Sequence, residues 1–483
     1  MNVAEINRMA CMSSFQSAIG TAGAVGGSER DARTAEIGRL KARDNQTNFY
    51  HLGFAYLVMA ATIAATIALF AAIEHAGLSW LWTLPVTFVA IVLMGASQHQ
   101  LGGAIHEATH YMLFDDKRLN ELASDWLAAF PIYTSTYAFR LHHLAHHQFV
   151  NDPERDPNFD QAKDSGHWLD FPIAHIDLLI AIARQLNPVL LVKYIIARAR
   201  YSALGVDTNP YADTARKGTP WAIRIGVLFA VGMPFVMIPI IALGRYGGYP
   251  LGMMVAVASA VLLASAAAVS VYYWRLPDDG YPQSRINPVI SHRATALGRI
   301  AYLTLLYLAL NVGEYVFNAP VWGYYVLLWI LPLFTTFPLF MILREWLQHG
   351  NADRGRYTNS RIFIVNPFAR YAIFPWGMDY HLPHHLFASV PHYKLKALHA
   401  FLLKDAEYRE KGLVVEGWSR HKAAGHPTIV DVLGPEYTPE GNAAHVDDAT
   451  LENADLNDAA GIARHAADSR RGISVKGGTQ APT

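Results

Sequence analysis

The chain has 483 residues, of which 52% are hydrophobic and only 16% are charged, with 39 basic and 39 acidic residues. A soluble protein carries about a quarter charged residues, so this composition favours a membrane protein. The balanced charge argues against nucleic acid as a partner, and the single cysteine, Cys11, excludes an internal disulfide and a cysteine-based metal site.

The N-terminal segment differs in composition from the rest of the chain. Residues 1–45 are rich in Gly, Ala, Ser and charged residues, so we expect this segment to be disordered. It contains no apolar core of the kind that a secretory signal peptide needs.

Long apolar runs fill much of the region 46–436, which we interpret as one domain. Six runs are close to the roughly 20 residues that cross about 30 Å of hydrocarbon. We predict spanning helices at 52–73, 78–97, 221–244, 250–274, 299–317 and 321–343. The links inside three successive pairs are very short, at 74–77, 245–249 and 318–320. The predicted fold is therefore all-α, an integral membrane bundle of about six spanning helices arranged as three hairpins.

Basic residues orient this bundle in the membrane. The three short links carry only Arg245, whereas many basic residues flank the other ends of the spans: Arg30, Arg33, Arg39, Lys41, Arg43, Lys117, Arg118, Arg275, Arg285, Arg293 and Arg299. The positive-inside rule makes this second face cytoplasmic and places both termini there. An even number of crossings then puts the histidine stretches described below in a cytoplasmic helical cap.

Two segments outside the spans supply the cap. The first is the stretch of about 120 residues between the second and third predicted spans. Its part 168–199 is apolar but interrupted by charged residues and histidine, which favours helices lying at the membrane surface rather than another span. Residues 344–436 follow the sixth span and form the second segment. From residue 437 the chain is polar and rich in Ala and Asp, so we expect a disordered tail over 437–483.

Three histidine-rich stretches lie in or beside these segments. The first holds His106 and His110, and the other two both read HxxHH: His143, His146 and His147, then His381, His384 and His385. Residues three and four apart share a helix face, so the rings of one stretch can converge on one point. Adjacent histidines diverge by about 100°, so their rings could serve two neighbouring metal ions. We interpret all eight as metal ligands.

Of four further histidines, we predict that one is a metal ligand and that three are not. His349 emerges where the sixth span meets the cytoplasm, and we take it as a ninth ligand. His142 shares no face with the later ligands at the expected spacing and is interpreted as a non-ligand. His392 and His399 are expected to be surface histidines on an amphipathic helix.

Carboxylates near the stretches are candidates for supporting roles. Asp152 and Asp156 follow the second stretch, where they either hydrogen-bond to ligands or are turn residues beside proline. Glu107 and Asp156 are the two candidate catalytic residues. Glu314 lies near the outer end of the fifth span, far from the histidines, which favours a structural role for this ionisable group.

The stretch from His106 to His110 also satisfies HExxH, the zinc metalloprotease pattern in which the glutamate is the general base. A protease needs one more ligand and has no use for two HxxHH stretches. We therefore favour Glu107 as a carboxylate that orients a ligand histidine. A non-catalytic transporter would hold its ligands inside the spans rather than beyond their ends.

The number and type of ligands indicate the metal. A structural zinc needs only four ligands, so eight or nine imidazoles suggest two ions. Imidazole suits iron better than magnesium or calcium, which prefer oxygen ligands, and it fits O₂ chemistry. Nearby carboxylates (Glu107, Asp156 and Asp379) would offset the positive charge of the ions. Because the site lies at the mouth of a membrane bundle, we expect an apolar substrate that enters from the lipid.

The ordered set HxxxH, HxxHH and HxxHH on a multi-span frame resembles the membrane fatty acid desaturase superfamily. The resemblance covers about residues 50–410 and extends to 106–114, to the Asp-Pro-rich stretch after the second box, and to 390–399. One departure is the six predicted spans, because the family more commonly has four.

The resemblance implies a non-haem di-iron site held by the eight box histidines and His349, which activates O₂ and introduces a double bond into a fatty acyl or lipid chain. The two electrons for each turnover would come from a separate donor, a ferredoxin or cytochrome b5 with its reductase. A fused cytochrome b5 domain would carry the haem signature His-Pro-Gly-Gly, which is absent here. The same histidine set also serves hydroxylases and ketolases of lipids or carotenoids, which remain the alternative.

Overall fold

The computed structural model describes residues 33–439, except 205–208, 210, 214, 217 and 422–424. It divides into two compact units, one ending at Arg43 and one beginning at Asp44. Most of the segment predicted to be disordered, 1–45, lies outside the described residues, but 33–41 are helical, which corrects the expectation for that part. The predicted disordered tail lies outside the described residues from 440 onward.

Among its described residues, the second unit contains six helical segments long and apolar enough to cross a membrane, as predicted. They are α2 (Thr47–His75), the short helix η1 (Trp80–Trp82) continued by α3 (Thr83–Thr109), α9 (Trp221–Tyr246), α10 (Leu251–Arg275), α11 (His292–Val316) and the interrupted segment Val321–His349. At 1.5 Å per residue, each exceeds the thickness of the hydrocarbon layer.

Helix α3 runs twelve residues beyond the predicted end of its span at residue 97. The polar sequence at 98–100 suggests that the span ends there, yet these side chains are bonded to backbone carbonyls of neighbouring segments. Gln98 Nε2 donates to Trp329 O at 2.8 Å, and His99 Nδ1 lies 2.8 Å from Ala372 O. With their polar groups paired, these residues stay inside the bundle, and the helix continues to the first histidine pair.

The sixth spanning segment is built from several short helical pieces. It comprises α12 (Val321–Tyr325), a π-helical turn η5 (Val326–Ile330), α13 (Leu331–Phe334) and α14 (Thr336–His349). Proline within the segment favours such breaks because it removes a backbone donor. Helix α14 crosses α3 closely at Gly95, where a Cβ atom would lie 2.0 Å from Thr336 Oγ1. This crossing brings the ends of α3 and α14 to the same place.

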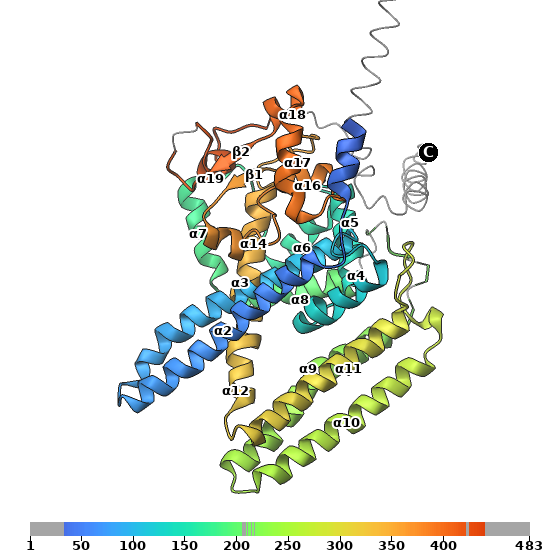
Figure 1. Ribbon diagram of the computed structural model, residues 1–483, viewed down its shortest axis with the longest axis vertical. Coiled ribbons are helices and arrows are strands. Elements are labelled where there is room, and N and C mark those ends of the chain that lie inside the picture. Colours follow the sequence, from blue (N-terminus) through green and yellow to red (C-terminus); the bar gives the residue numbers. More distant parts are fainter. Residues whose placement is uncertain are drawn as a thin grey trace, which may run out of the picture. The chain divides into compact units, whose positions relative to one another are not determined.

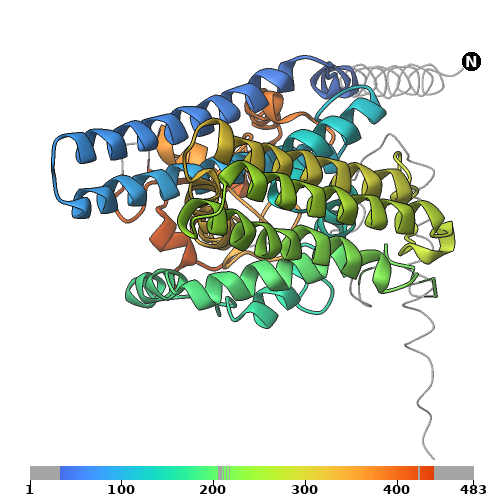
Figure 2. The ribbon, with the colours of Figure 1, turned by 90° about the horizontal axis from the view of Figure 1, so that it is seen from below.

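The spanning helices form two groups. Helices α2 and α3 pair as one hairpin, and α9, α10 and α11 lie side by side as a second group (Figures 1 and 2). Their outer faces are apolar: Phe88 on α3 is 69% exposed and Phe235 on α9 is 76% exposed. Large apolar side chains at this exposure indicate surfaces that face lipid rather than water. The second unit is a multi-pass membrane bundle.

A buried ion pair ties α9 to α11 at the end of the bundle with the short links. Arg245 Nη2 lies 2.7 Å from Glu314 Oε2, and Glu314 Oε1 accepts a hydrogen bond from Trp322 N at 2.8 Å. The structural role predicted for Glu314 is therefore confirmed.

The rest of the unit forms a cap of short elements at the other end of α3 and α14 (Figure 1). Its helices are α4 (Lys117–Ser124), α5 (Thr136–Gln148), α6 (Pro157–Ser165), α7 (His175–Gln185), α8 (Pro188–Leu204), α15 (Pro367–Ala372), α16 (His381–Leu386), α17 (Leu395–Leu402), α18 (Ala406–Lys411) and α19 (Ile429–Leu433). Strands β1 (Ile362–Ile364) and β2 (Val414–Glu416) pair in parallel, with Ile362 opposite Val414.

Helices α7 and α8 correspond to the apolar segment 168–199. They are apolar enough together to form a span, but the chain bends by 80° between them. They are therefore not one straight spanning helix, and their placement at the membrane surface stays a prediction.

Candidate metal centre

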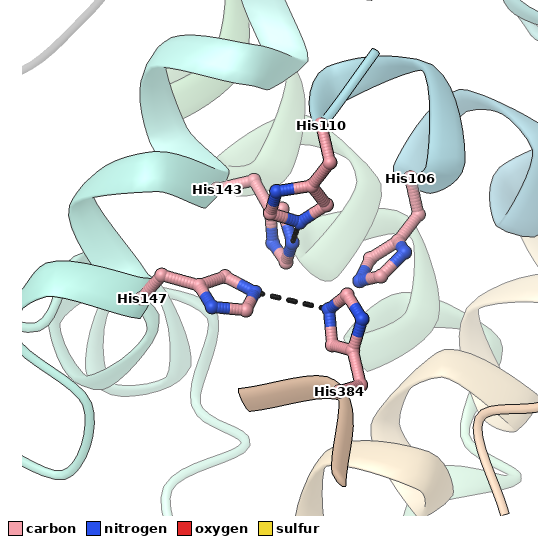
Figure 3. A group of neighbouring side chains, drawn as sticks. All are labelled: His106, His110, His143, His147 and His384. Carbon is pink, nitrogen blue, oxygen red and sulfur yellow. Dashed lines mark hydrogen bonds between the residues drawn. The ribbon is translucent and has the colours of Figure 1, made fainter. Parts of the chain in front are cut away.

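Five of the predicted ligands gather into one group, which we name the first histidine group. His106 lies in the last turn of α3 and His110 is the residue directly after it, His143 and His147 come from α5, and His384 comes from α16. One ligand atom from each lies within 4.8 Å of the others, and all five side chains are buried. Figure 3 shows the five rings turned toward one another from three separate elements.

The other four predicted ligands form a second histidine group beside the first. His146, His349 and His385 have ligand atoms within 4.8 Å of one another. His381 completes the group, because its Nε2 lies 2.9 Å from His349 Nε2 and 3.0 Å from His385 Nε2. The structure thus brings all nine predicted ligands together, including the isolated His349.

The adjacent histidines of each HxxHH stretch divide between the two groups. His146 belongs to the second group and His147 to the first, and His385 and His384 divide in the same way. The predicted divergence of adjacent rings on a helix is confirmed. Two HxxHH stretches therefore contribute to both groups at once.

The spacing of the ring nitrogens fits a shared metal ion. The Nε2 atoms of His110 and His143 are 2.9 Å apart, and those of His147 and His384 are 3.2 Å apart. Metal–imidazole bonds are about 2.0–2.1 Å, so two ligands of one ion are about 2.9 Å apart at a right angle and about 3.4 Å apart in a tetrahedron. The observed distances lie within this range.

The protonation of these rings also suits metal binding. Burial lowers the pKa of the His143, His147 and His384 imidazoles well below the usual value, because a buried charged ring would lose its hydration. Each ring is therefore neutral and offers a lone pair. Neither ring nitrogen of His106 has a hydrogen-bond partner among the described residues, although the side chain is 2% exposed. A metal ion would satisfy one of these nitrogens.

Two histidines of the second group have partners that fix the direction of their lone pairs. His349 Nδ1 donates to the Asn359 carbonyl at 3.0 Å, and His146 Nδ1 lies 3.0 Å from Asp156 Oδ2. Burial acts to lower the pKa of His146, but the Asp156 carboxylate outweighs burial, so the pKa is raised. In the neutral ring, the contact with the Asp156 carboxylate keeps the proton on Nδ1. With Nδ1 protonated in both rings, Nε2 is the atom that can bind a metal.

Asp156 has a second function in the same turn. Its carboxylate caps the N-terminus of α6 by accepting from Asn158 N at 2.9 Å, and it also accepts from Asn151 N at 3.0 Å. Asp156 is therefore both a turn residue beside proline and a hydrogen-bond partner of a predicted ligand. Asp152 differs, because its carboxylate pairs with Arg155 in the same turn and with the distant Arg354 rather than with a histidine.

Glu107 lies beside the first group but makes its closest contact elsewhere. Its Oε2 accepts a hydrogen bond from the backbone of His392 at 3.0 Å, and its Oε1 is 3.7 Å from His106 Nδ1. The second distance is too long for a hydrogen bond. The carboxylate therefore joins α3 to the segment before α17, and an orienting role toward His106 stays a prediction.

The prediction that His392 is a surface residue is wrong. The side chain is 7% exposed, and its Nε2 lies 2.8 Å from Asn48 Oδ1 on α2. His51 and Trp376 also pack on its ring, at 4.6 and 4.5 Å between ring centroids, and local sequence does not show these contacts. His142 lies outside both histidine groups and contacts Asn158 Oδ1 at 2.8 Å. Asp379, predicted to offset metal charge, forms an ion pair with Arg370 at 2.7 Å.

Two buried arginines that support the site were not assigned from the sequence. Arg140 donates to the carbonyls of Ala108 at 2.7 Å and Thr109 at 3.0 Å, so it caps the C-terminus of α3. Arg361 donates to the Leu347 carbonyl at 2.9 Å and caps α14 in the same way. Cations at helix C-termini satisfy unpaired carbonyls and the helix dipole. The sequence offers a signal only for Arg140, which lies three residues before His143.

Comparison with known proteins identifies the family. The family model described as fatty acid desaturase matches residues 80–285 and 269–415, which together include both histidine groups. The chain belongs to the fatty acid desaturase family. The resemblance seen in the histidine boxes is thereby confirmed.

Individual desaturases match over shorter stretches. Dihydrorhizobitoxine desaturase of Bradyrhizobium elkanii is 31% identical over 116 residues, which is 24% of this chain and 29% of that protein. Delta(5) fatty acid desaturase fat-4 of Caenorhabditis elegans is 36% identical over 69 residues, which is 14% of this chain and 15% of that protein. The matches thus cover less than a third of either relative.

Proposed function

We propose that this protein is an O₂-dependent desaturase that introduces a double bond into a fatty acyl or lipid chain, using two iron ions held by the nine histidines. The observation that carries the proposal is the division of the HxxHH stretches between two neighbouring histidine groups. A single zinc site would leave four or five of these imidazoles without a purpose.

The roles of the chain's own residues follow from their contacts. The first histidine group and the second each bind one ion, and Asp156 and the Asn359 carbonyl orient two of the ligands. The bound irons supply the activation of O₂ and the removal of hydrogen from an unactivated C–H bond. Burial of all nine rings excludes bulk water, which limits side reactions of the activated oxygen.

The overall reaction balances with an external reductant. The substrate loses two hydrogens, and O₂ is reduced to two waters with two further electrons and two protons. A separate ferredoxin, or a cytochrome b5 with its reductase, would supply the electrons. We place the histidine groups and both termini on the cytoplasmic side, where such donors are found, because the flanks of the spans at that end are basic.

The HExxH interpretation accounts for less of the site. A zinc protease needs one ligand besides His106 and His110, whereas three more histidines surround this pair. The carboxylate of Glu107, which would be the general base, accepts a backbone hydrogen bond from His392 instead. We therefore favour the desaturase over the protease.

Lipid mass spectrometry tests the proposed function directly. A host that expresses the wild-type chain with its donor should accumulate lipids two hydrogens lighter, and a host that expresses His384→Ala should accumulate none. His384 contributes to the first group, so the variant protein should also bind less iron than the wild type. The control is His75→Ala, which changes an exposed histidine at the end of α2.

Other outcomes would change the proposal in defined ways. Lipids one oxygen heavier would identify a hydroxylase, which shares the hydrogen abstraction. Purified protein that holds one zinc and no iron would contradict the di-iron site.

A further inference from the structure

A cavity of about 380 Å³ opens beside the second histidine group. It is lined by α6, by the loop 167–171, by α8 and by the last turns of α14. His349, from the second group, forms part of its wall. A molecule bound in this cavity would therefore lie next to the proposed metal site.

Much of the cavity wall is apolar and aromatic. Phe159 on α6, Trp168 in the loop, Tyr194 on α8 and Trp346 on α14 all contribute. Such a wall suits a hydrocarbon chain, because binding removes the apolar surfaces of both the chain and the wall from water.

Two polar groups on the cavity wall are incompletely paired. His167 is 1% exposed, and apart from the backbone carbonyl of Ser165 no described residue offers its ring nitrogens a hydrogen-bond partner. Gln161 is 3% exposed, and its Oε1 is likewise unsatisfied by any described residue. Buried polar atoms normally have partners, so these groups indicate a ligand that supplies them.

The charges on the cavity wall indicate which kind of polar group the ligand carries. Burial lowers the pKa of the His167 imidazole to about 4, and the Ser165 carbonyl opposes this only in part, so the ring is neutral at pH 7. The charged side chains that line the cavity are Arg198, Glu345 and Asp170, which leave no excess of positive charge. The wall therefore offers neutral donors and acceptors rather than an anion site.

We propose that this cavity binds the substrate, and that the substrate is an uncharged amphiphile. A hydroxyl, amide or ester group of the ligand bonds to His167 and Gln161, and the apolar chain runs along the aromatic wall toward His349. A bare hydrocarbon would leave the two polar groups incompletely paired. A carboxylate or phosphate would add negative charge to a wall where Glu345 and Asp170 already outnumber Arg198. This inference rests on the proposed function for the statement that the bound chain is the one that reacts.

The test is a binding measurement that needs no turnover. The full-length, iron-loaded protein in detergent is titrated with dodecan-1-ol, dodecanamide, dodecanoate and dodecane, and bound probe is counted by native mass spectrometry. The alcohol and the amide should bind about ten-fold more tightly than the alkane or the carboxylate, as expected for one or two satisfied buried hydrogen bonds. Equal affinities for all four probes would overturn the proposal.

Two variants assign the binding to this cavity. His167→Phe keeps an aromatic ring against Tyr194 but removes both nitrogens. In this variant the alcohol and the alkane should bind with about equal affinity. A preference that survives this change would also overturn the proposal. Ala162→Phe fills the cavity from α6 without removing a polar group, so it should weaken every probe; unchanged binding would place the ligand elsewhere. His175→Phe, at an exposed position on α7, is the matched control and should retain the full preference.

The binding measurement tests the proposed substrate site, and the lipid analysis tests the proposed reaction, so each proposal can be rejected without the other. If the probe preference is present but no lipid is desaturated, the site is right and the proposed reaction is wrong. If lipids are desaturated but the preference is absent, the reaction is right and this assignment of the substrate class is wrong.

Discussion

Asp156 makes both a local contact, as a helix cap, and a contact with a histidine of the second group. As the N-cap of α6 it satisfies a backbone donor, and the same carboxylate faces His146 Nδ1. The first role is visible in the sequence, because aspartate before Pro157 is a common helix start. The second depends on how α5 and α6 pack, and it is the role that matters for the site.

Replacing Asp156 with asparagine should weaken the second group selectively. Asparagine can still cap α6, but without the negative charge the proton on His146 is no longer held at Nδ1. We expect metal affinity at the second group to fall about 10–100-fold, the usual effect of losing a carboxylate that orients a ligand. Titration of the apoprotein with Fe(II) would show one tight and one weakened site.

Asp152→Asn is the matched control for this prediction. Asp152 lies in the same turn and pairs with Arg155 and Arg354 rather than with a histidine. Iron binding should be unchanged in this variant. Equal losses in both variants would indicate damage to the turn, and the proposed role of Asp156 would be rejected.

Among the helices, α3 and α5 depend on one another through Arg140. The guanidinium lies on α5, caps α3 through two carbonyls and pairs with Glu121 on α4, with Nη1 3.1 Å from Glu121 Oε2. The arginine is fully buried. It therefore holds the helix that carries His106 and His110 against the helix that carries the second stretch.

Arg140→Met should destabilise the cap strongly. The variant removes the cation from the buried Glu121 carboxylate, which keeps a hydrogen bond from Asn120 Nδ2 at 3.2 Å. Breaking a buried ion pair in this way costs about 3–5 kcal/mol. The melting temperature of the protein in detergent should fall, and iron should be lost with it. Circular dichroism and metal analysis at the same temperatures would follow both effects.

A double variant separates the two causes of this loss. If the unpaired carboxylate dominates, Arg140→Met with Glu121→Leu should recover part of the stability that Arg140→Met loses. No recovery would mean that capping of α3, rather than the ion pair, is the main contribution of Arg140.

At the scale of the whole molecule, the short links and the histidine groups lie at opposite ends of the spans. Helix α3 starts after the link 76–79 and ends at the first group, and the sixth span starts after 317–320 and ends at His349. The positive-inside rule then predicts that the links face the exterior and the cap faces the cytoplasm.

Accessibility of introduced cysteines tests this orientation. In a Cys11→Ser background, Ser79→Cys lies in the first short link and Lys411→Cys lies in the cap, both at exposed positions. A membrane-impermeant maleimide added to intact cells should label the first variant at least about ten-fold more than the second. Inverted vesicles should give the reverse pattern, and labelling of both variants from the same side would contradict the topology.

The sequence by itself determined the spans, the eight box histidines and the family. These signals are local: an apolar run of the right length, and histidine spacing that matches one helix face, need no knowledge of distant contacts. The position of His349 after a span was enough to suggest the ninth ligand, although a single histidine has no internal pattern.

Tertiary structure alone decided which histidines share a group, which aspartate supports a ligand and which histidine is buried. His392 is buried by α2, more than 300 residues away, and Asp156 rather than Asp152 faces a ligand because of how α6 packs on α5. The continuation of α3 past residue 97 depended on carbonyls from 329 and 372. The burial of a side chain and its hydrogen-bond partners depend on contacts between segments far apart in the sequence. The spacing of residues along the chain does not predict these contacts.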